Sequence, residues 1–278
     1  MHIDAEKAIK ELVAKGIKLP PQPKVLIELQ KKLASKSCNI KDLASIISSD
    51  PGITAMLFKT ARSPAFSGGK KFNSVEQALM VIGVKQIYNL AQAVVLSTSI
   101  SSATRKSFDI FWTRSQEVAQ LAALIAADRV SVCNIFPDQA YMAGIFHECG
   151  VPVLMQRFPE YCAKLRLDTA TCWPKLSDED ALFNVDHCSI GYLVAHHWKL
   201  PDFICQAILY HHEMPHEELG AVRTLVATLL LATHFYHRIT RAKDPAWPKL
   251  RMEVLAELGI HPDVEQAYYE DISEQFLA

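Results

Sequence analysis

Apolar residues recur at helical spacing along almost the whole chain, and this periodicity constrains the fold more than any other feature. Val25, Leu26, Leu29 and Leu33, for example, follow one another at the three- and four-residue steps that place side chains on one face of a helix. Stretches of alternating apolar and polar residues, which are typical of strands, are almost absent. Glycine is also scarce: 10 of 278 residues, about half the roughly 7% that is usual, which disfavours strand-rich folds and glycine-rich phosphate loops. The sequence therefore predicts an all-α protein.

Capping residues, prolines and glycines mark the ends of the predicted helices. Ser74 is followed by Gln77 in a capping-box pattern, and the helix that it opens is predicted to end at Gly83. Pro137 is expected at the first position of a later helix. A long helix is predicted from Ser177 up to the segment Leu200–Pro201, because proline cannot continue a helix.

A polar serine and threonine stretch over residues 97–102 is the best internal boundary. It predicts an amino-terminal helical subdomain over residues 1–105 and a helical core over residues 106–278. A chain of this length can form one large domain or two modest ones and can bury a sizeable core.

The charge balance and the cysteine content limit which binding partners and which cellular compartment the sequence predicts. The chain has 29 Lys and Arg against 30 Asp and Glu, a net charge of -1, with no basic stripe, so nucleic acid is not an expected partner. No apolar run reaches the roughly 18 residues of a membrane span, and the first residues do not resemble an export signal. Seven scattered cysteines without a CxxC pair indicate reduced thiols. These features predict a cytoplasmic protein with no membrane partner.

The histidines are strongly clustered in the second half of the chain. Eight of the 11 lie within 51 positions: His187, His196, His197, His211, His212, His216, His234 and His237. Imidazole is a common metal ligand, so the cluster raises a metal hypothesis. The alternatives are buried histidines bonded to backbone carbonyls, histidines that complement a helix dipole, and surface residues.

Several segments together carry a family resemblance. They are Leu19–Pro23, Asp50–Thr54, Ser74–Gly83, Ala143–Gly150, Asp186–Gly191 and Ala207–Glu213. In this order and spacing they resemble the HD superfamily of metal-dependent phosphohydrolases, and specifically its HDOD branch, from about residue 15 to about residue 240. The resemblance implies an HD-domain-like helical core with an additional amino-terminal helical subdomain.

The resemblance also implies where metal ligands would stand. Active HD enzymes gather a helix histidine, a His-Asp pair and a later aspartate around one or two metals, and HD-GYP relatives add a histidine and a His-His pair. Here Arg114 stands at the first position, His147 and Glu148 form the pair, and Thr233 stands at the later aspartate. The HD-GYP additions are matched by His187, His211 and His212, whereas the glycine-tyrosine-proline motif is missing. HDOD proteins usually lack part of the ligand set and are regarded as signalling modules without established catalysis.

These replacements differ in chemical consequence. Glu148 keeps a carboxylate ligand, and Thr233 keeps only a hydroxyl. Arg114 is the most disruptive, because a guanidinium stays charged and repels a cation. Two roles remain open for Arg114: an ion pair with Glu148 in place of a metal, or direct binding of a phosphate.

The sequence thus supports two hypotheses. The favoured one is a bacterial signalling module that binds a protein partner or a nucleotide-like ligand, with Arg114 as a ligand-binding residue and no catalytic residue. The alternative is a metal-dependent phosphohydrolase acting on nucleotides or cyclic dinucleotides, with His147 and Glu148 as its catalytic residues. The predicted metal ligands are His147, Glu148, His187, His211 and His212, and no cofactor is certain. Manganese, iron, magnesium, zinc and nickel are the candidate ions.

Overall fold

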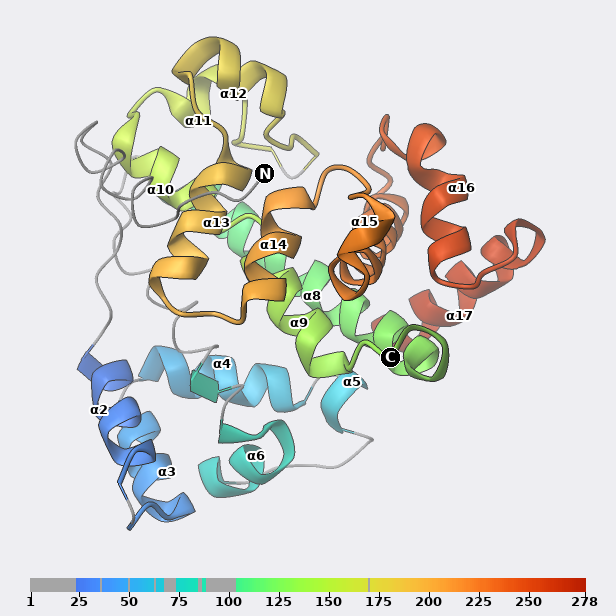
Figure 1. Cartoon of the computed structure of the whole chain (residues 1–278). Coiled ribbons are helices and arrows are strands. Elements are labelled where there is room, and N and C mark those ends of the chain that lie inside the picture. Colours follow the sequence, from blue (N-terminus) through green and yellow to red (C-terminus); the bar gives the residue numbers. More distant parts are fainter. Residues whose placement is uncertain are drawn as a thin grey trace. The chain divides into compact units, whose positions relative to one another are not determined.

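The computed structural model describes residues 24–35, 37–49, 51–62, 64–67, 74–84, 87–88, 104–169 and 171–278. All regular elements in this part of the chain are helices (Figure 1), which confirms the all-α prediction. The described helices fall into two compact units, α2 to α6 and α8 to α17, with the division between residues 99 and 100. The segment Leu19–Pro23, residue Asp50 and the predicted boundary at residues 97–102 lie outside the described residues.

The amino-terminal unit contains five described helices: α2 (Lys24–Leu33), α3 (Ile40–Ser48), α4 (Pro51–Ala61), α5 (Pro64–Ser67) and α6 (Val75–Ile82). The Ser74 hydroxyl accepts a hydrogen bond from the backbone N–H of Gln77 at 3.2 Å, and Gly83 ends the helix with a φ of 85°, so the predicted limits of α6 are confirmed. The core of this unit includes Leu29, Ile47 and Leu57.

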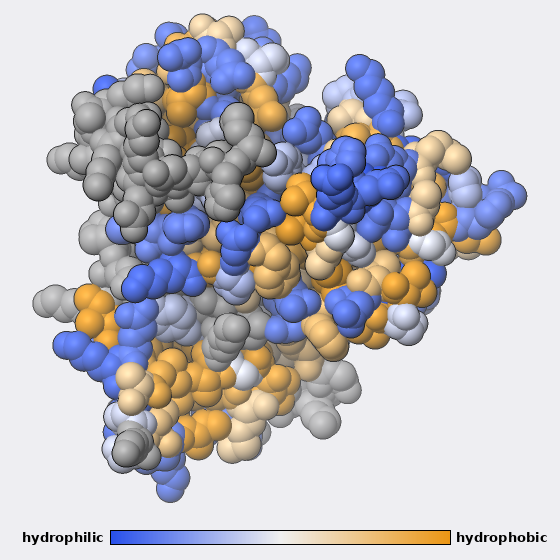
Figure 2. Space-filling model, in the orientation of Figure 1, coloured by the Kyte–Doolittle hydropathy of each residue, from blue (hydrophilic) through white to orange (hydrophobic). Residues whose placement is uncertain are grey.

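Hydrophobic side chains also reach the surface of this unit, where they are visible over its helices in Figure 2. Large exposed apolar residues here include Ile27, Leu33, Met80 and Val81.

The second unit carries the remaining described α-helices: α8 (Arg105–Cys133), α9 (Pro137–Phe146), α10 (Gly150–Arg157), α11 (Tyr161–Lys164), α12 (Leu176–Phe183), α13 (His187–His197), α14 (Asp202–Tyr210), α15 (Ala221–Ile239), α16 (Trp247–Glu257) and α17 (Glu265–Leu277). The long helix α8 packs against α9 and α15, and α13 packs against α10 and α14. A Cβ atom on Gly144 would lie 2.5 Å from the Cα atom of Ala119, so this small pair allows α8 and α9 to approach closely. None of the helices in the described segments has the length and apolarity that crossing a membrane requires.

The prediction of one continuous helix from Ser177 to Leu200 is wrong, because the chain forms two helices, α12 and α13, over this range. Asn184 ends α12 in the left-handed conformation (φ 53°, ψ 38°), which asparagine tolerates better than most residues. Asp186 then caps α13, since its Oδ1 accepts from the backbone N–H of Ser189 at 2.7 Å. The break places His187 in the first turn of a new helix.

A second close approach positions the turn that follows α9. A Cβ atom on Gly150 would lie 2.1 Å from the carbonyl oxygen of His187 and 2.8 Å from the backbone nitrogen of Gly191. Only glycine fits there, so the start of α10 lies directly against the start of α13. This contact brings His147 and Glu148 near His187.

Candidate functional site

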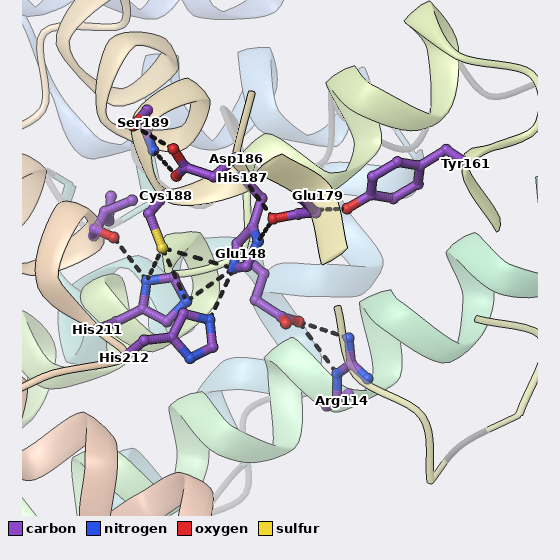
Figure 3. Close-up of polar contacts among 11 residues, drawn as sticks. Arg114, Glu148, Tyr161, Glu179, Asp186, His187, Cys188, Ser189, His211 and His212 are labelled. Atoms are coloured by element: carbon purple, nitrogen blue, oxygen red, sulfur yellow. Dashed lines mark hydrogen bonds and ion pairs between the residues drawn. The ribbon is translucent and has the colours of Figure 1, made fainter. Parts of the chain in front are cut away.

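Arg114 and Glu148 form a buried ion pair in the helical core (Figure 3). The Arg114 Nη2 and Nε atoms donate to Glu148 Oε2 at 2.8 and 3.2 Å, and the two side chains are 3% and 0% exposed. Arg114 Nη1 also donates to the carbonyl of Cys172 at 3.1 Å, and the guanidinium carbon lies 3.9 Å from the centre of the Trp173 ring. The structure thus shows the ion pair, the first of the two roles that the sequence left open for Arg114.

This pair changes what Glu148 can bind. Burial raises the pKa of the Glu148 carboxyl, but the Arg114 guanidinium, with smaller effects from His147 and His187, outweighs burial and holds the pKa below its ordinary value. The carboxylate is therefore ionised, and its Oε2 atom is engaged by Arg114. Its Oε1 atom is buried and has no hydrogen-bond partner.

His147 is oriented by the helix that precedes it. Its Nδ1–H donates to the carbonyl of Gly144 at 2.6 Å, because a carbonyl can only accept. Burial lowers the pKa of His147, so the ring is neutral and its Nε2 atom carries a lone pair. That Nε2 atom is buried and has no hydrogen-bond partner. His147 therefore matches the alternative of a buried histidine that bonds to a backbone carbonyl, and its Nε2 atom remains free to accept a hydrogen bond.

Glu179 on α12 orients His187. Its Oε2 atom accepts from His187 Nδ1–H at 2.6 Å and from the His187 backbone N–H at 3.1 Å, while its Oε1 atom accepts from the Tyr161 hydroxyl. Burial raises the pKa of Tyr161 well above its ordinary value, so the hydroxyl stays a donor. The His187 Nε2 atom consequently points away from Glu179, toward α14.

His211 and His212, at the carboxyl end of α14, meet His187 there. His211 Nδ1–H donates to the carbonyl of Ile208 at 2.7 Å. The Nε2 atom of His187 lies 3.3 Å from His211 Nε2 and 3.0 Å from His212 Nε2. Burial lowers the pKa of His211 well below its ordinary value and that of His212 to about 3, so both rings are neutral at neutral pH. Cys188 completes the group, with its Sγ atom 3.7 Å from His187 Nε2.

The structure therefore divides the five predicted metal ligands into two sets. His187, His211 and His212 converge with Cys188, and the candidate ligand atoms of these four all lie within 4.8 Å of one another. Glu148 is paired with Arg114, and the ring of His147 lies edge-on to that of His211, 5.1 Å between ring centres. A hydrolytic two-metal centre does not fit this arrangement. It would require the Glu148 carboxylate, which the Arg114 guanidinium already neutralises, and a second carboxylate where the family resemblance places Thr233.

Sequence reasoning missed Cys188 and Glu179. Cys188 directly follows His187, and that adjacency was the available signal. No local signal marked Glu179, because its role depends on the break between α12 and α13.

A cavity of about 830 Å³ lies beside this group. His147, His211, His212 and Thr233 line it, together with the rings of Trp173 and Trp247 and the basic side chains of Lys164, Arg166, Lys175 and Lys243. Acidic lining residues are fewer, namely Asp178 and Asp244. The walls thus combine positive charge, flat aromatic faces and imidazoles.

A separate histidine pair shapes one wall of the cavity. The Oδ2 atom of Asp244 lies 3.0 Å from His234 Nδ1 and 3.6 Å from His237 Nδ1, and the His234 ring stacks on Trp247. Asp244 Oδ1 also accepts from the backbone N–H of Trp247 at 3.1 Å. His234 and His237 are therefore buried packing residues, whereas His196, His197 and His216 are exposed.

Asp244→Asn is expected to lower the free energy of unfolding by about 1.5–3 kcal/mol near neutral pH, the range for hydrogen bonds to a charged group. Burial raises the pKa of Asp244, but the hydrogen bond from His234 and the nearby His237 ring, 3.6 Å away, hold it well below its ordinary value. An aspartate whose pKa is lowered by folding stabilises the fold fully above its unfolded pKa of about 3.9, and it loses this effect as the pH falls toward its folded pKa. The difference between wild type and variant, measured by urea unfolding, should therefore be constant above about pH 5 and shrink progressively below that pH.

Asp263→Asn is the matched control, because Asp263 lies 3.5 Å from His261 in a pair that is exposed to solvent. It should cost about 0–1 kcal/mol at any pH. An Asp244→Asn effect that does not change with pH would contradict the assignment.

The sequence profile of the HDOD domain matches residues 19–214 of this chain. Among curated proteins, an uncharacterized protein of Treponema pallidum (strain Nichols) is 23% identical over 218 residues, which cover 77% of this chain and 41% of that protein. This chain therefore corresponds to less than half of that relative's length.

Solved structures with a similar fold come from several bacteria. An HDOD domain protein with unknown function from Geobacter sulfurreducens has a TM-score of 0.60 at 23% identity, with 99% of this chain and 100% of the other covered. A protein from Shewanella amazonensis SB2B, provisionally named a metal-dependent phosphohydrolase, has a TM-score of 0.66 at 20% identity, with 98% and 97% covered. A provisionally named signal transduction protein from Marinobacter aquaeolei VT8 has a TM-score of 0.68 at 21% identity, with 97% and 62% covered. Likeness at these identities shows a shared fold.

Proposed function

This chain belongs to the HDOD family, and from that premise we propose that it is a bacterial signalling module that binds a nucleotide-like anion in the cavity of its helical core. Binding, and not hydrolysis, is its biochemical activity in this proposal. Ligand binding is then transmitted to a protein partner in the signalling pathway.

The chemistry of the cavity walls carries the proposal. A volume of about 830 Å³ is in the usual range of small-molecule sites, about 300–1,000 Å³. Four basic side chains supply the charge that phosphate groups require, and Trp173 and Trp247 add aromatic rings to the wall. Arg114 already covers one face of Trp173 and His234 one face of Trp247, so a base would contact the rest of these rings. His147 Nε2, an acceptor, and Trp173 Nε1, a donor, are both buried without hydrogen-bond partners. A ligand with both donors and acceptors would satisfy them.

The Arg114–Glu148 pair favours binding over hydrolysis. Hydrolysis by HD enzymes requires a metal-bound water as nucleophile. Here the guanidinium neutralises the carboxylate that would hold a metal, at 2.8 Å. Thr233, on the cavity wall, offers only a hydroxyl where the family resemblance implies an aspartate.

The free thiols agree with the predicted cytoplasmic location. All seven cysteines are unpaired, as expected in a reducing compartment. This supports a cytoplasmic module.

Thermal melting with a panel of nucleoside phosphates, cyclic mononucleotides and cyclic dinucleotides tests the proposal. A ligand at 100 times its dissociation constant adds about 2.7 kcal/mol of stability and raises the melting temperature. Lys175→Ala and Lys243→Ala, which remove charge from the cavity wall, should weaken binding of the ligand that is found. Lys249→Ala, an exposed lysine on α16 that does not line the cavity, is the matched control. If no member of the panel shifts the melting temperature, or if the control weakens binding equally, the proposal fails.

A metal-dependent phosphohydrolase is the second candidate, and the convergence of His187, His211 and His212 favours it. If any member of the panel is hydrolysed when manganese is added, and His147→Ala abolishes that hydrolysis, the protein is this enzyme and not a binding module. Under the favoured proposal the nucleotides remain intact over hours, with or without manganese.

A further inference from the structure

Four side chains converge where the amino end of α13 meets the carboxyl end of α14 (Figure 3). They are His187 and Cys188 from α13, and His211 and His212, which follow α14. His187, Cys188 and His211 are buried, and His212 is partly buried. Its three histidines stand at the positions of the HD-GYP additions, but the group includes a thiol and excludes His147 and Glu148.

The hydrogen bonds around the group turn two ring nitrogens toward one another. His187 uses its Nδ1–H on the Glu179 carboxylate, and His211 uses its Nδ1–H on the Ile208 carbonyl. Their Nε2 atoms therefore face each other at 3.3 Å. This separation lets both nitrogens bind one metal ion placed between them. Metal-binding histidines characteristically donate their other N–H to a carboxylate or a backbone carbonyl, as both do here.

The distances fit one tetrahedral zinc ion. Zinc binds imidazole nitrogen at about 2.0–2.1 Å and thiolate sulfur at about 2.3 Å, so tetrahedral geometry separates two nitrogens by about 3.3 Å and a nitrogen from sulfur by about 3.6 Å. The Nε2 atom of His187 lies 3.3 and 3.0 Å from those of His211 and His212. The Cys188 Sγ atom lies 3.7 Å from His187 Nε2 and 4.0 Å from His211 Nε2.

We propose that His187, Cys188, His211 and His212 bind one zinc ion in a closed site that clips α13 to α14. A thiolate with three imidazoles selects zinc over magnesium, calcium or manganese, which prefer oxygen ligands. Four protein ligands leave no position open for a metal-bound water, so the site is structural. This inference does not rest on the ligand proposed for the cavity, although His211 and His212 also line that cavity.

The test uses the full chain without a histidine tag, stripped with a chelator and dialysed against zinc. We expect one zinc ion per chain by elemental mass spectrometry and a higher melting temperature of the zinc-loaded protein. The cobalt-substituted protein should show a thiolate-to-cobalt charge-transfer band in the near ultraviolet, which imidazole and carboxylate ligands do not produce. Less than stoichiometric zinc in excess metal, or a cobalt spectrum without the thiolate band, would overturn the proposal and favour a proton shared between the rings.

Cys188→Ser removes the thiolate with little change in size. It should abolish the charge-transfer band and weaken zinc binding at least tenfold. Cys205→Ser is the matched control, because Cys205 is also a buried thiol of this unit but bonds to the Leu200 carbonyl, outside the group. A Cys188→Ser protein that keeps the band, or a control that loses it, would also overturn the assignment. The wild-type cobalt spectrum remains decisive if the variant does not fold, and neither measurement involves a nucleotide.

Discussion

Arg114→Met is expected to lower the free energy of unfolding by about 3–5 kcal/mol, the cost of removing one partner of a buried ion pair. The variant leaves the Glu148 carboxylate buried without the guanidinium that neutralises it. Methionine fills much of the volume of arginine, so the loss reports charge more than packing. Urea unfolding of metal-free protein measures the effect.

Two further variants distinguish a charge effect from a general weakening of α8. Arg114→Met combined with Glu148→Gln should recover much of the lost stability, because no unpaired charge remains. Arg105→Met is the matched control, since Arg105 also lies on α8 and pairs with Asp109 at 3.0 Å, but the two are 56% and 58% exposed. The control should cost about 0.3–0.5 kcal/mol. Equal losses in Arg114→Met and the control, or no recovery in the double variant, would show that the pair does not hold this part of the core.

Glu179→Leu is expected to cost at least about 3 kcal/mol in free energy of unfolding. Glu179 is fully buried and accepts from the Tyr161 hydroxyl and from two N–H groups of His187. Each buried donor left without a partner costs about 1–3 kcal/mol, and leucine offers no acceptor to any of them. The measurement is urea unfolding in the presence of a chelator.

Tyr161→Phe provides a graded comparison, because it removes one donor together with its bond. It should cost about 1.5–3 kcal/mol, the range for one hydrogen bond to a charged group. Glu179→Gln, which keeps the shape of the side chain, should lower zinc affinity about 10–100-fold, as is usual when the partner of a metal-binding histidine is changed. If Glu179→Leu costs no more than Tyr161→Phe, the two bonds to His187 contribute nothing to stability.

Much of the fold follows from local patterns. The apolar periodicity predicted an all-α chain, and the capping pattern at Ser74 and the glycine at position 83 predicted both ends of α6. Pro137 was likewise predicted to begin a helix, and α9 begins there. These features depend on residues within one or two helical turns of each other, so a single sequence contains the information.

The candidate site was only partly predictable. The family resemblance drew attention to Arg114, Glu148 and the histidines, and an ion pair was one of the two roles considered for Arg114. The division of the five predicted ligands into two sets could not be foreseen. This division depends on the hydrogen bonds that orient each ring and so decide which nitrogen faces the group. The Ile208 carbonyl orients His211 in this way.

The sequence by itself determined the helical class, both ends of α6, the start of α9 and the residue types available for chemistry, because these depend on spacing along the chain. Only the tertiary structure decided which groups meet. Arg114 and Glu148 are 34 positions apart, and His187 and His211 are 24 apart, yet each pair is in contact. Close helix approaches at Gly144 and Gly150 and the break before His187 produce these contacts. Such contacts depend on packing among several helices at once, which no local pattern encodes.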